Sequence, residues 1–390
     1  MFRMGKEEKE AVIKVIDSGN LFKINDGLQE AINFEKELQE KFECSKALFM
    51  TSGKGALISA LIGMGIGPGD EVIVPAYTYI ATAIAVVATG AIPIIAEIDE
   101  TLTLDIKDVE LKISPRTKAI IPVHIQGFPN NMDALLELSK KYKIKILEDA
   151  CQADGGSYHG KRLGTIGNAG ALSFNFFKII SSGEGGALLT NDEIIYQRAL
   201  IHHDSSAIAF FGNQLNGVTE EQFCGTEFRG NEILASILRE QLKKMDTILN
   251  DLRKNKKTVM EALKNDFNFA PSNDIAGDCG LVVPFQFKTE QEARRFAESE
   301  GIYGSLPIDT GKHVYSNWTA IMNKKGAFHP LMDPFKMEAN KDFVPDYKPD
   351  MCPKTLDILS RTVYVYIHPD MTDNQINELI LNCKSALKNI

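Results

Sequence analysis

Short apolar segments alternate with helical segments over the first half of the chain, and this alternation constrains the fold more than any other feature. The apolar segments have the length of buried strands, and the stretches between them are long enough for crossover helices. Strands joined in this way form a parallel sheet that helices cover on both faces. We therefore expect an α/β fold with a large, doubly wound, mostly parallel sheet, whose strands cover residues 46–50, 70–74, 92–96, 118–124, 143–147 and 169–174.

The length of 390 residues predicts more than one domain. We expect a large domain at residues 1–250, which begins with amphipathic helices at residues 7–17 and 28–42 and ends with a helix at residues 233–249. A smaller C-terminal α/β domain is expected at residues 251–390. Its predicted elements are helices at residues 251–265, 290–301 and 371–386 and strands at residues 280–287 and 363–367.

Residues 310–361 are poorly periodic and rich in aromatic, proline and aspartate residues. Such a segment forms either the wall of a substrate pocket or a well-packed irregular connection, and its composition alone does not separate the two. The pocket candidates in it are His313, Trp318, His329, Tyr347 and Lys348.

The composition argues against several classes of protein. The net charge of −9 comes without any basic block, so we expect no nucleic-acid partner. No apolar run reaches the roughly 18 residues that suggest a membrane helix, and the N-terminus lacks an apolar signal core, so we expect a cytoplasmic protein without a membrane partner. The six cysteines form no Cys-x-x-Cys pair. We expect no metal site and no disulfide framework, only reduced and mainly buried thiols.

Lys178 follows an aromatic pair and precedes a glycine-rich turn, and strands are expected on both sides of this loop. A lysine that is partly desolvated by Phe176 and Phe177 has a lowered pKa, and its neutral amine can attack a carbonyl. This is how a Schiff-base lysine is prepared. The alternative is a lysine whose stem packs on the aromatic rings while its ammonium group stays in water.

Asp149 follows Glu148 at the end of the predicted strand at residues 143–147. The carboxyl ends of parallel strands are where α/β sheets bind ligands. A carboxylate in that place can pair with the pyridine nitrogen of pyridoxal phosphate and keep it protonated. The alternative is an N-cap at a turn from strand to helix.

A turn of small residues, Ser52 and Gly53, opens the predicted helix at residues 56–64. Free backbone N–H groups and the helix dipole suit a phosphate at such a turn. A plain helix cap with a glycine that eases the turn is the alternative.

Together, these segments resemble the DegT/DnrJ/EryC1/StrS sugar aminotransferase family, within the fold type I pyridoxal-phosphate enzymes. The resemblance extends over nearly the whole chain, and several ordered motifs make it specific. The matching residues are 19–22, 34–37, 51–53, 75–79, 121–124, 148–150, 173–174, 178, 183–186, 228–229 and 232.

The resemblance implies a fold type I aminotransferase that binds pyridoxal 5'-phosphate. It implies a homodimer with shared active sites, an amino donor that is glutamate or glutamine, and a sugar acceptor with a keto or aldehyde group. Lys178 would form the Schiff base and shuttle protons, and Asp149 would act as its catalytic partner on the ring nitrogen. The other cofactor contacts that the resemblance implies are Tyr79 stacked on the ring, Gln152 at the phenolic oxygen, and Gly53 and Ser173 at the phosphate.

Two residues depart from the family pattern at the phosphate end. Lys54 stands where the family usually has threonine or serine, and Glu227 stands where an asparagine reaches the phosphate of the neighbouring subunit. We expect Lys54 of one subunit and Glu227 of the other to form an ion pair there, because a glutamate alone would be repelled by the phosphate. The alternative is a local shift in register, with Asn231 making the phosphate contact.

The acceptor is expected to be a nucleotide-linked sugar or an octulosonate-type sugar acid, and the product an amino sugar for a surface polysaccharide. A cyclitol ketone as acceptor and a non-catalytic binding protein on the same scaffold are the alternatives. Related dehydratases carry histidine in place of the lysine, so Lys178 argues against that activity. His124 is not expected to be catalytic: it lies at a strand end near the expected substrate, and a structural role is the alternative. The run at residues 202–204 lacks a third metal ligand, and residues 205–222 are expected to form a long functional loop.

Overall fold

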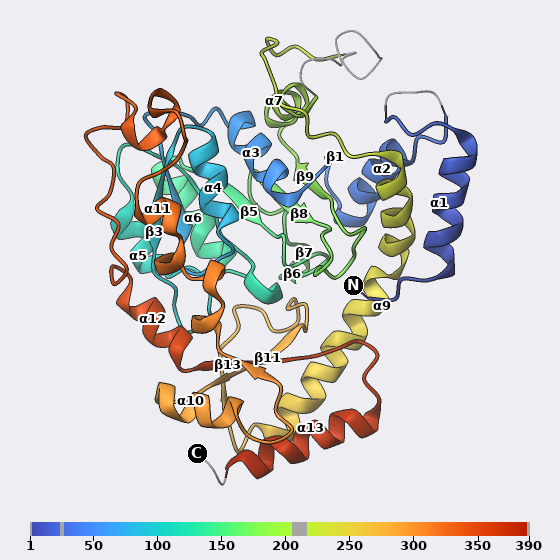
Figure 1. The fold of residues 1–390 in the computed structure, drawn as a ribbon, viewed down its shortest axis with the longest axis vertical. Helices are drawn as coiled ribbons and strands as arrows, with labels where there is room; N and C mark the ends of the chain where they lie inside the picture. Colours follow the sequence, from blue (N-terminus) through green and yellow to red (C-terminus); the bar gives the residue numbers. More distant parts are fainter. Residues whose placement is uncertain (1, 24–26, 205–216, 388–390) are drawn as a thin grey trace.

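A seven-stranded sheet forms the centre of the large domain, with strands in the order β1-β9-β8-β5-β4-β2-β3 (Figure 1). The computed structural model describes residues 2–23, 27–204 and 217–387. β9 runs antiparallel to both neighbours and the other adjacent pairs are parallel, which confirms the predicted mostly parallel sheet. The strands are β1 (Lys46–Met50), β2 (Glu71–Pro75), β3 (Ile92–Ala96), β4 (Thr117–Ile120), β5 (Lys145–Asp149), β8 (Ala169–Ser173) and β9 (Gly186–Thr190), and β6 (Ser157–Tyr158) and β7 (Lys161–Arg162) form a separate short hairpin.

β4 ends at Ile120, earlier than predicted, because Pro122 has no N–H group to donate to a neighbouring strand. The chain beyond the strand still follows β5. The carbonyl of Pro122 accepts the N–H of Asp149, and the N–H of His124 donates to the carbonyl of Asp149. These two bonds fix the backbone of Asp149 at the carboxyl end of the sheet.

Helices cover both faces of this sheet, as the alternating sequence predicts. Buried side chains fill the interfaces in two clusters. One face carries α3 (Gly53–Gly63), α4 (Ala81–Ala88) and α7 (Glu193–His203), and the other carries α2 (Glu30–Phe42), α5 (Ile106–Lys112) and α6 (Met132–Tyr142). The helices α5 and α6 are not among the elements predicted from the sequence.

The longest helix, α9 (Glu232–Leu263), is one continuous element of 32 residues, where the sequence predicts two helices. Its buried residues Met245, Ile248, Leu249 and Leu252 continue at helical spacing through the predicted break, and the segment contains neither proline nor glycine. α9 packs against α1 (Lys6–Ser18) and α2 over the large domain and against α13 in the small domain. It joins the two regions (Figure 1), and the predicted boundary at residue 250 falls inside it.

The C-terminal region contains a four-stranded antiparallel sheet in the order β10-β11-β13-β12. Its aromatic core includes Phe267, Phe285 and Phe296, whose rings lie 4.8–5.2 Å apart. Thr372 caps the last helix, because its hydroxyl accepts the N–H of Gln375. The elements are β10 (Asn268–Phe269), β11 (Val282–Gln286), α10 (Glu290–Ala297), β12 (Gly304–Ser305), α12 (Pro353–Ser360), β13 (Thr362–Tyr366) and α13 (Asp373–Ala386).

The irregular segment between β12 and α12 returns along the large domain beside α4 (Figure 1). Two of its aromatic residues belong to the core and not to a pocket. The indole N–H of Trp318 donates to the carbonyl of Lys312, and the hydroxyl of Tyr347 donates to the carbonyl of Pro93. Its short helices are η3 (Pro307–Asp309), η4 (Gly311–His313), η5 (Tyr315–Asn317), α11 (Thr319–Met322), η6 (Pro330–Met332) and η7 (Pro334–Lys336).

Most of the cysteines are buried, as predicted. All six lie in the described residues and are free, and Cys44, Cys279, Cys352 and Cys383 are buried. Among the helices that the structure describes, none is long and apolar enough to cross a membrane.

Candidate active site

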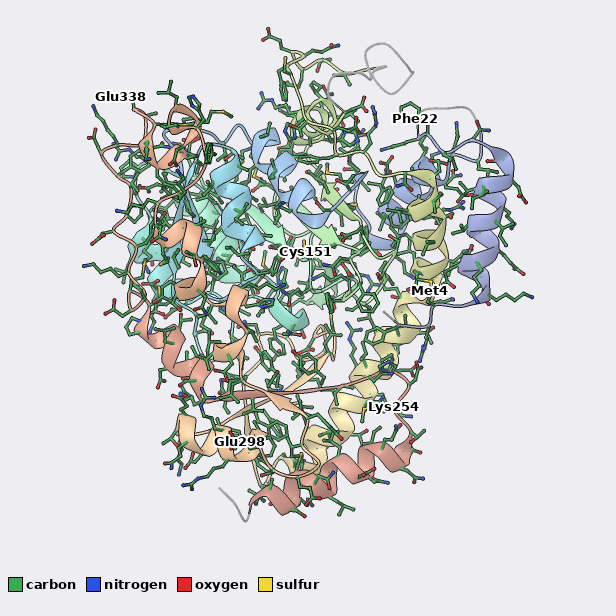
Figure 2. The ribbon with its side chains drawn as sticks, viewed as in Figure 1. Met4, Phe22, Cys151, Lys254, Glu298 and Glu338 are labelled. Atoms are coloured by element: carbon green, nitrogen blue, oxygen red, sulfur yellow. The ribbon has the colours of Figure 1, made fainter. Side chains whose placement is uncertain are left out.

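A cavity of about 300 Å³ opens where β1, β2, β4, β5 and β8 end. This is the edge of the sheet where the sequence predicts the site. Of the predicted site residues, all but Glu227 line the cavity: Gly53, Lys54, Tyr79, Asp149, Gln152, Ser173 and Lys178. Cys151, which also lines it, lies near the centre of the molecule (Figure 2).

Asp149 is only 5% exposed and is held by two hydrogen bonds. Its Oδ2 accepts the hydroxyl of Thr82 at 2.7 Å, and its Oδ1 accepts the N–H of Cys151 at 3.2 Å. The Thr82 hydroxyl also lies 2.8 Å from that of Thr78. No helix begins at Asp149, since the residues that follow form turns. The N-cap alternative is therefore wrong, and the carboxylate is fixed in the wall of the cavity.

Glu148 has a purely structural environment, although it is adjacent to Asp149. It is fully buried and accepts the backbone N–H groups of Gly164, Ile166 and Gly167. His124 lies with its Nε2 3.1 Å from Glu148 and accepts a backbone N–H at Nδ1, so the proton on Nε2 donates to the carboxylate. Of the two roles open to His124, its burial and these bonds support the structural one.

Lys178 lies in the loop between β8 and β9, as predicted, and is half-buried with its side chain at the cavity. Its Nζ has no hydrogen bond or ion pair with any described residue. Phe176 and Phe177 are 54% and 83% exposed and contact each other edge to face, so within one chain they do not enclose the lysine. The residues that anchor the loop are instead Ile179 and Ile180, which are buried in the core.

The first turn of α3 faces the cavity through Ser52, Gly53 and Lys54. The Ser52 hydroxyl caps the helix by accepting the N–H of Gly55 at 3.0 Å. A Cβ at Gly53 would lie 2.6 Å from Sγ of Cys151 and 2.8 Å from Cβ of Ser173. Only glycine therefore lets the helix start this close to the end of β8, and the free N–H groups of a helix start suit an anion there.

Gln152 and Tyr79 also line the cavity. Oε1 of Gln152 accepts the N–H of Gln126 at 3.2 Å, which leaves the amide NH₂ group as the donor toward the cavity. Tyr79 is 41% exposed and presents its ring to the cavity. Nζ of Lys312 lies 5.2 Å from the centre of this ring and the ring of His313 lies 5.5 Å from it.

The turn η4 is tied to the large domain by backbone bonds, since the N–H groups of Thr78 and Ile80 donate to the carbonyls of His313 and Lys312. Burial lowers the pKa of His313, and the nearby charge of Lys178 lowers it further. Of the five pocket candidates in this segment, His313 thus contacts Tyr79, which lines the cavity. No local pattern identified Lys312 or Thr82, because both reach the site only through tertiary contacts.

Glu227 lies outside the cavity and is half-exposed. Its Oε2 lies 2.7 Å from the guanidinium of Arg229. The segment that contains both residues lies beside the start of α3, because the N–H of Thr51 donates to the carbonyl of Phe228. In the described part of this single chain, no ion pair joins Lys54 to Glu227, and their pairing between subunits stays a prediction. Asn231 caps α9 by accepting the N–H of Leu234.

The residues at 202–204 have separate partners. Nδ1 of His202 lies 2.9 Å from the Ser59 hydroxyl, His203 bonds the carbonyl of Leu200, and Asp204 pairs with Arg229. Residues 205–216, the larger part of the predicted functional loop, lie outside the described residues.

Comparison with known proteins places this site in a family. A model described as the DegT/DnrJ/EryC1/StrS aminotransferase family matches residues 3–301. The chain belongs to this family. The resemblance seen in the sequence is confirmed, and the family is one of pyridoxal-phosphate-dependent aminotransferases of fold type I.

Relatives match over most of the chain. The spore coat polysaccharide biosynthesis protein SpsC of Bacillus subtilis (strain 168) is 31% identical over 396 residues, which cover 99% of this chain and 95% of that protein. The GDP-perosamine synthase of Escherichia coli O157:H7 is 35% identical over 263 residues, 67% of this chain and 69% of that protein. The crystal structure of 3-amino-5-hydroxybenzoic acid (AHBA) synthase matches with a TM-score of 0.80 and 25% identity, covering 100% of this chain and 98% of that one.

The side chains around the cavity fit the cofactor of this family. An amine that has no partner within the described part of the chain, a buried carboxylate, an exposed aromatic ring and a capped helix start all face one space. These are the groups that pyridoxal phosphate requires for its aldehyde carbon, ring nitrogen, ring face and phosphate.

Proposed function

We propose that this protein transfers an amino group from glutamate or glutamine to the keto or aldehyde carbon of a sugar. The observation that carries the proposal is that Asp149, the last residue of β5, and Lys178, in the loop between β8 and β9, line the same cavity. A lysine and a carboxylate at one cavity are the two groups that the chemistry of pyridoxal phosphate needs from a protein.

We propose a place for each part of the cofactor among the residues that line the cavity. Asp149 would hold the ring nitrogen, Tyr79 would cover the ring, and the amide NH₂ of Gln152 would donate to the phenolic oxygen. Ser173 and the first turn of α3 would hold the phosphate. When bound, pyridoxal phosphate withdraws electrons from the substrate carbon next to the amine, so that this carbon can release its proton.

Lys178 would move that proton. Its Nζ has no partner among the described residues, so the amine can accept a proton from the substrate carbon and return it elsewhere. The loop backbone holds the lysine in place, because its N–H donates to the carbonyl of Asn175 and the next two residues are buried. Asp149 is held by Thr82, so the ring would be fixed relative to the amine.

The acceptor that we propose is a nucleotide-linked keto sugar or an octulosonate-type sugar acid, used to make an amino sugar for a surface polysaccharide. Two relatives support this choice by their names, which refer to spore coat polysaccharide and to GDP-perosamine. The exposed Lys312 and the partly buried His313 lie beside Tyr79 and could offer polar groups to such a substrate on this side of the cavity.

The half-reaction tests this function. With pyridoxal phosphate added, we expect a visible absorption band that disappears with glutamate or glutamine as the corresponding 2-oxo acid is released in equal amount. Keto sugars, sugar acids and inososes added afterwards should restore the band only where they accept the amine. A protein that forms no band, or whose band persists with both donors, would support the non-catalytic binding protein instead.

We also propose a homodimer with shared active sites. Exposed aromatic residues beside Lys178 support it, because an apolar patch of this kind at a site is commonly covered. In such a dimer, Glu227 of one subunit would pair with the partner's Lys54 at the phosphate end.

A double-mutant cycle tests that pair. The variants Lys54→Met and Glu227→Gln should each change the Kd of pyridoxal phosphate, and the double variant should differ from the product of the two effects by about fivefold, which corresponds to ~1 kcal/mol of coupling. Kd is measured by titrating the visible band. Effects that multiply without coupling would contradict the pair and leave the register shift with Asn231 as the explanation.

A further inference from the structure

Gln126 has a backbone conformation that non-glycine residues rarely adopt. It lies in the short turn η1 (Ile125–Gly127), with a φ of 50° and a ψ of 21°, and the φ of Gly127 is 81°. A left-handed conformation is unfavourable for a residue with a Cβ. It persists only where the surrounding structure holds it, and such positions cluster at functional sites. This turn follows β4 at the edge of the sheet where the cavity opens.

The N–H of Gln126 donates to Oε1 of Gln152 at 3.2 Å. A backbone N–H can only donate, so the side-chain atom that faces it is the amide oxygen. Because the chain is fixed on both sides of the turn, the left-handed conformation of Gln126 is what directs this N–H at Gln152. The amide of Gln152 lines the cavity and therefore has one orientation, with its NH₂ group free to donate there.

His124 fixes the turn on the side of the parallel sheet. Its N–H donates to the carbonyl of Asp149 at 3.0 Å, and its carbonyl accepts the N–H of Gly127 at 3.1 Å. The ring of His124 is fully buried, with Nε2 3.1 Å from Glu148. The start of the turn is thus tied to the strand that ends at Asp149.

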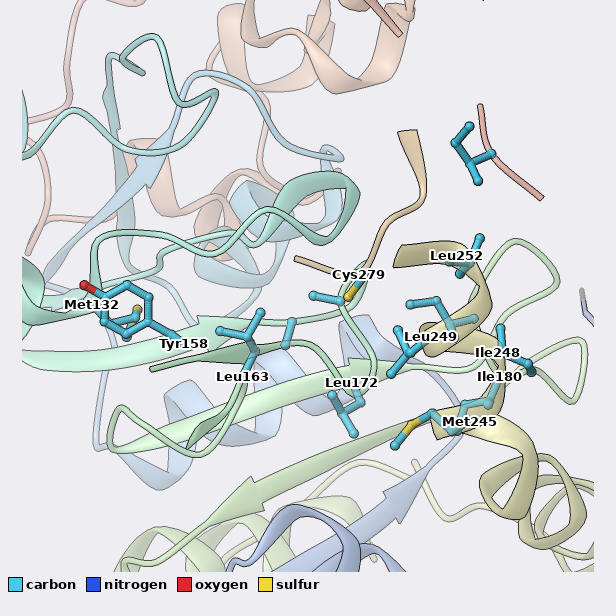
Figure 3. Close-up of a cluster of buried hydrophobic side chains, with 14 of the residues drawn as sticks. Met132, Tyr158, Leu163, Leu172, Ile180, Met245, Ile248, Leu249, Leu252 and Cys279 are labelled. Carbon is cyan, nitrogen blue, oxygen red and sulfur yellow. The ribbon is translucent and has the colours of Figure 1, made fainter. Parts of the chain in front are cut away.

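The segment that leads into β11 fixes the turn on the other side. The N–H of Cys279 donates to the carbonyl of Gly127 at 3.2 Å. A Cβ at Gly127 would lie 2.4 Å from Cβ of Cys279 and 2.9 Å from its Sγ, so only glycine allows this close approach. Cys279 has little room to move, because it is buried in the apolar cluster that also contains Leu163 and Leu249 (Figure 3).

We propose that Gln126 is a positioning residue that fixes the amide of Gln152 through its backbone N–H, an inference that rests on the proposed contact of Gln152 with the cofactor. The C-terminal region takes part, because Cys279 holds the turn in place. Without the bond from Gln126, the amide is free to rotate and to present its oxygen to the cavity. That oxygen would be repelled by the ionised phenolic oxygen of pyridoxal phosphate, so binding would weaken.

Hydrogen exchange tests the bond in the apo-protein, without cofactor or substrate. Exchange of single backbone N–H groups is followed by mass spectrometry with residue-level fragmentation. In Gln152→Leu, which has no acceptor, the N–H of Gln126 should exchange about tenfold faster than in the wild type. In Gln152→Glu, a side-chain oxygen still accepts this N–H, so slow exchange should persist. The N–H of Gly127 bonds to the carbonyl of His124 and should be unchanged in both variants.

The Kd of pyridoxal phosphate, titrated by the visible band, tests the role of the turn. Gly127→Ala forces the turn away from Cys279, so we expect Kd to rise about tenfold and the N–H of Gln126 to exchange faster. Adding Cys279→Gly removes the close contact and should restore much of both. In a Gln152→Leu background, Gly127→Ala should have no further effect on Kd, whereas a general loss of structure would still raise it.

Gly160→Ala is the matched control. Gly160 has a φ of 82°, close to that of Gly127, but among the described residues no atom beyond its chain neighbours lies within 4 Å of an added Cβ. This variant introduces the same backbone strain and should lower Tm without changing Kd or the exchange at Gln126.

Two results would overturn the proposal. One is equal exchange of the Gln126 N–H in the wild type and Gln152→Leu, and the other is an equal Kd in Gly127→Ala and Gly160→Ala. If Gly127→Ala does not fold, the exchange in Gln152→Leu decides alone. Because that exchange needs no cofactor, a failed half-reaction together with the expected exchange would count against the proposed function only.

Discussion

Lys178→Ala should lower the rate of amine transfer by ~10⁴-fold or more and abolish the visible band with pyridoxal phosphate. Alanine can neither form a Schiff base nor carry a proton between substrate atoms. The fold should be unaffected, because Nζ of Lys178 makes no hydrogen bond or ion pair with a described residue and its removal leaves no buried group without a partner. Absorption spectra, the release of 2-oxo acid and Tm are measured on the same preparation.

The matched control is Lys161→Ala, which removes an exposed lysine from the short hairpin formed by β6 and β7. This variant should retain the band, the half-reaction and Tm. If Lys178→Ala still formed the band, another amine would be the reacting group, and Lys54 is the other lysine that lines the cavity within the described residues. Loss of the band together with a large fall in Tm would show a structural role for Lys178 and contradict the role proposed here.

Asp149→Asn should lower the rate of the half-reaction by roughly 10³-fold while the visible band with pyridoxal phosphate still forms. The amide has the same shape as the carboxylate but no negative charge to hold a proton on the ring nitrogen. The amide oxygen can accept the N–H of Cys151 while the amide NH₂ donates to the Thr82 hydroxyl, so the side chain should keep its position. The rate is followed by stopped-flow absorbance with excess donor.

Thr82→Val provides a graded comparison for this variant. It removes the hydrogen bond to Asp149 and keeps the shape of the side chain, so we expect a smaller loss of about tenfold. Equal losses in both variants would mean that the position of Asp149 matters more than its charge. An unchanged rate in Asp149→Asn would remove Asp149 from the catalytic site.

Local sequence patterns predict much of the fold. Strands were predicted correctly because runs such as residues 92–96 are apolar on both faces, which is typical of a strand buried between two layers of helices. Local patterns also predicted two helices in place of α9, because Asn250 and Asp251 interrupt the apolar run, and this prediction was wrong. In the structure these two residues fall on the outer face of the helix, and the buried stripe passes beneath them.

Local reasoning failed where exposure depends on neighbours far away in the sequence. Phe176 and Phe177 suggested an enclosed lysine, yet both rings are exposed in the single chain. Trp318 and Tyr347 suggested a pocket, yet their polar atoms bond to backbone carbonyls within the core. Aromatic residues are equally suited to a pocket wall and to a packed interior, and only the surrounding elements decide between them.

By itself, the sequence determined the parallel sheet, the family and the residues that line the cavity, because strand length, apolar spacing and short motifs act over neighbouring positions. Only the tertiary structure brought Thr82 to Asp149, 67 positions away, and turned Lys312 and His313 toward Tyr79. It alone brought the backbone N–H of Gln126 to the side-chain amide of Gln152. The order of the strands and the packing of α9 set those distances, and no periodicity along the chain encodes them.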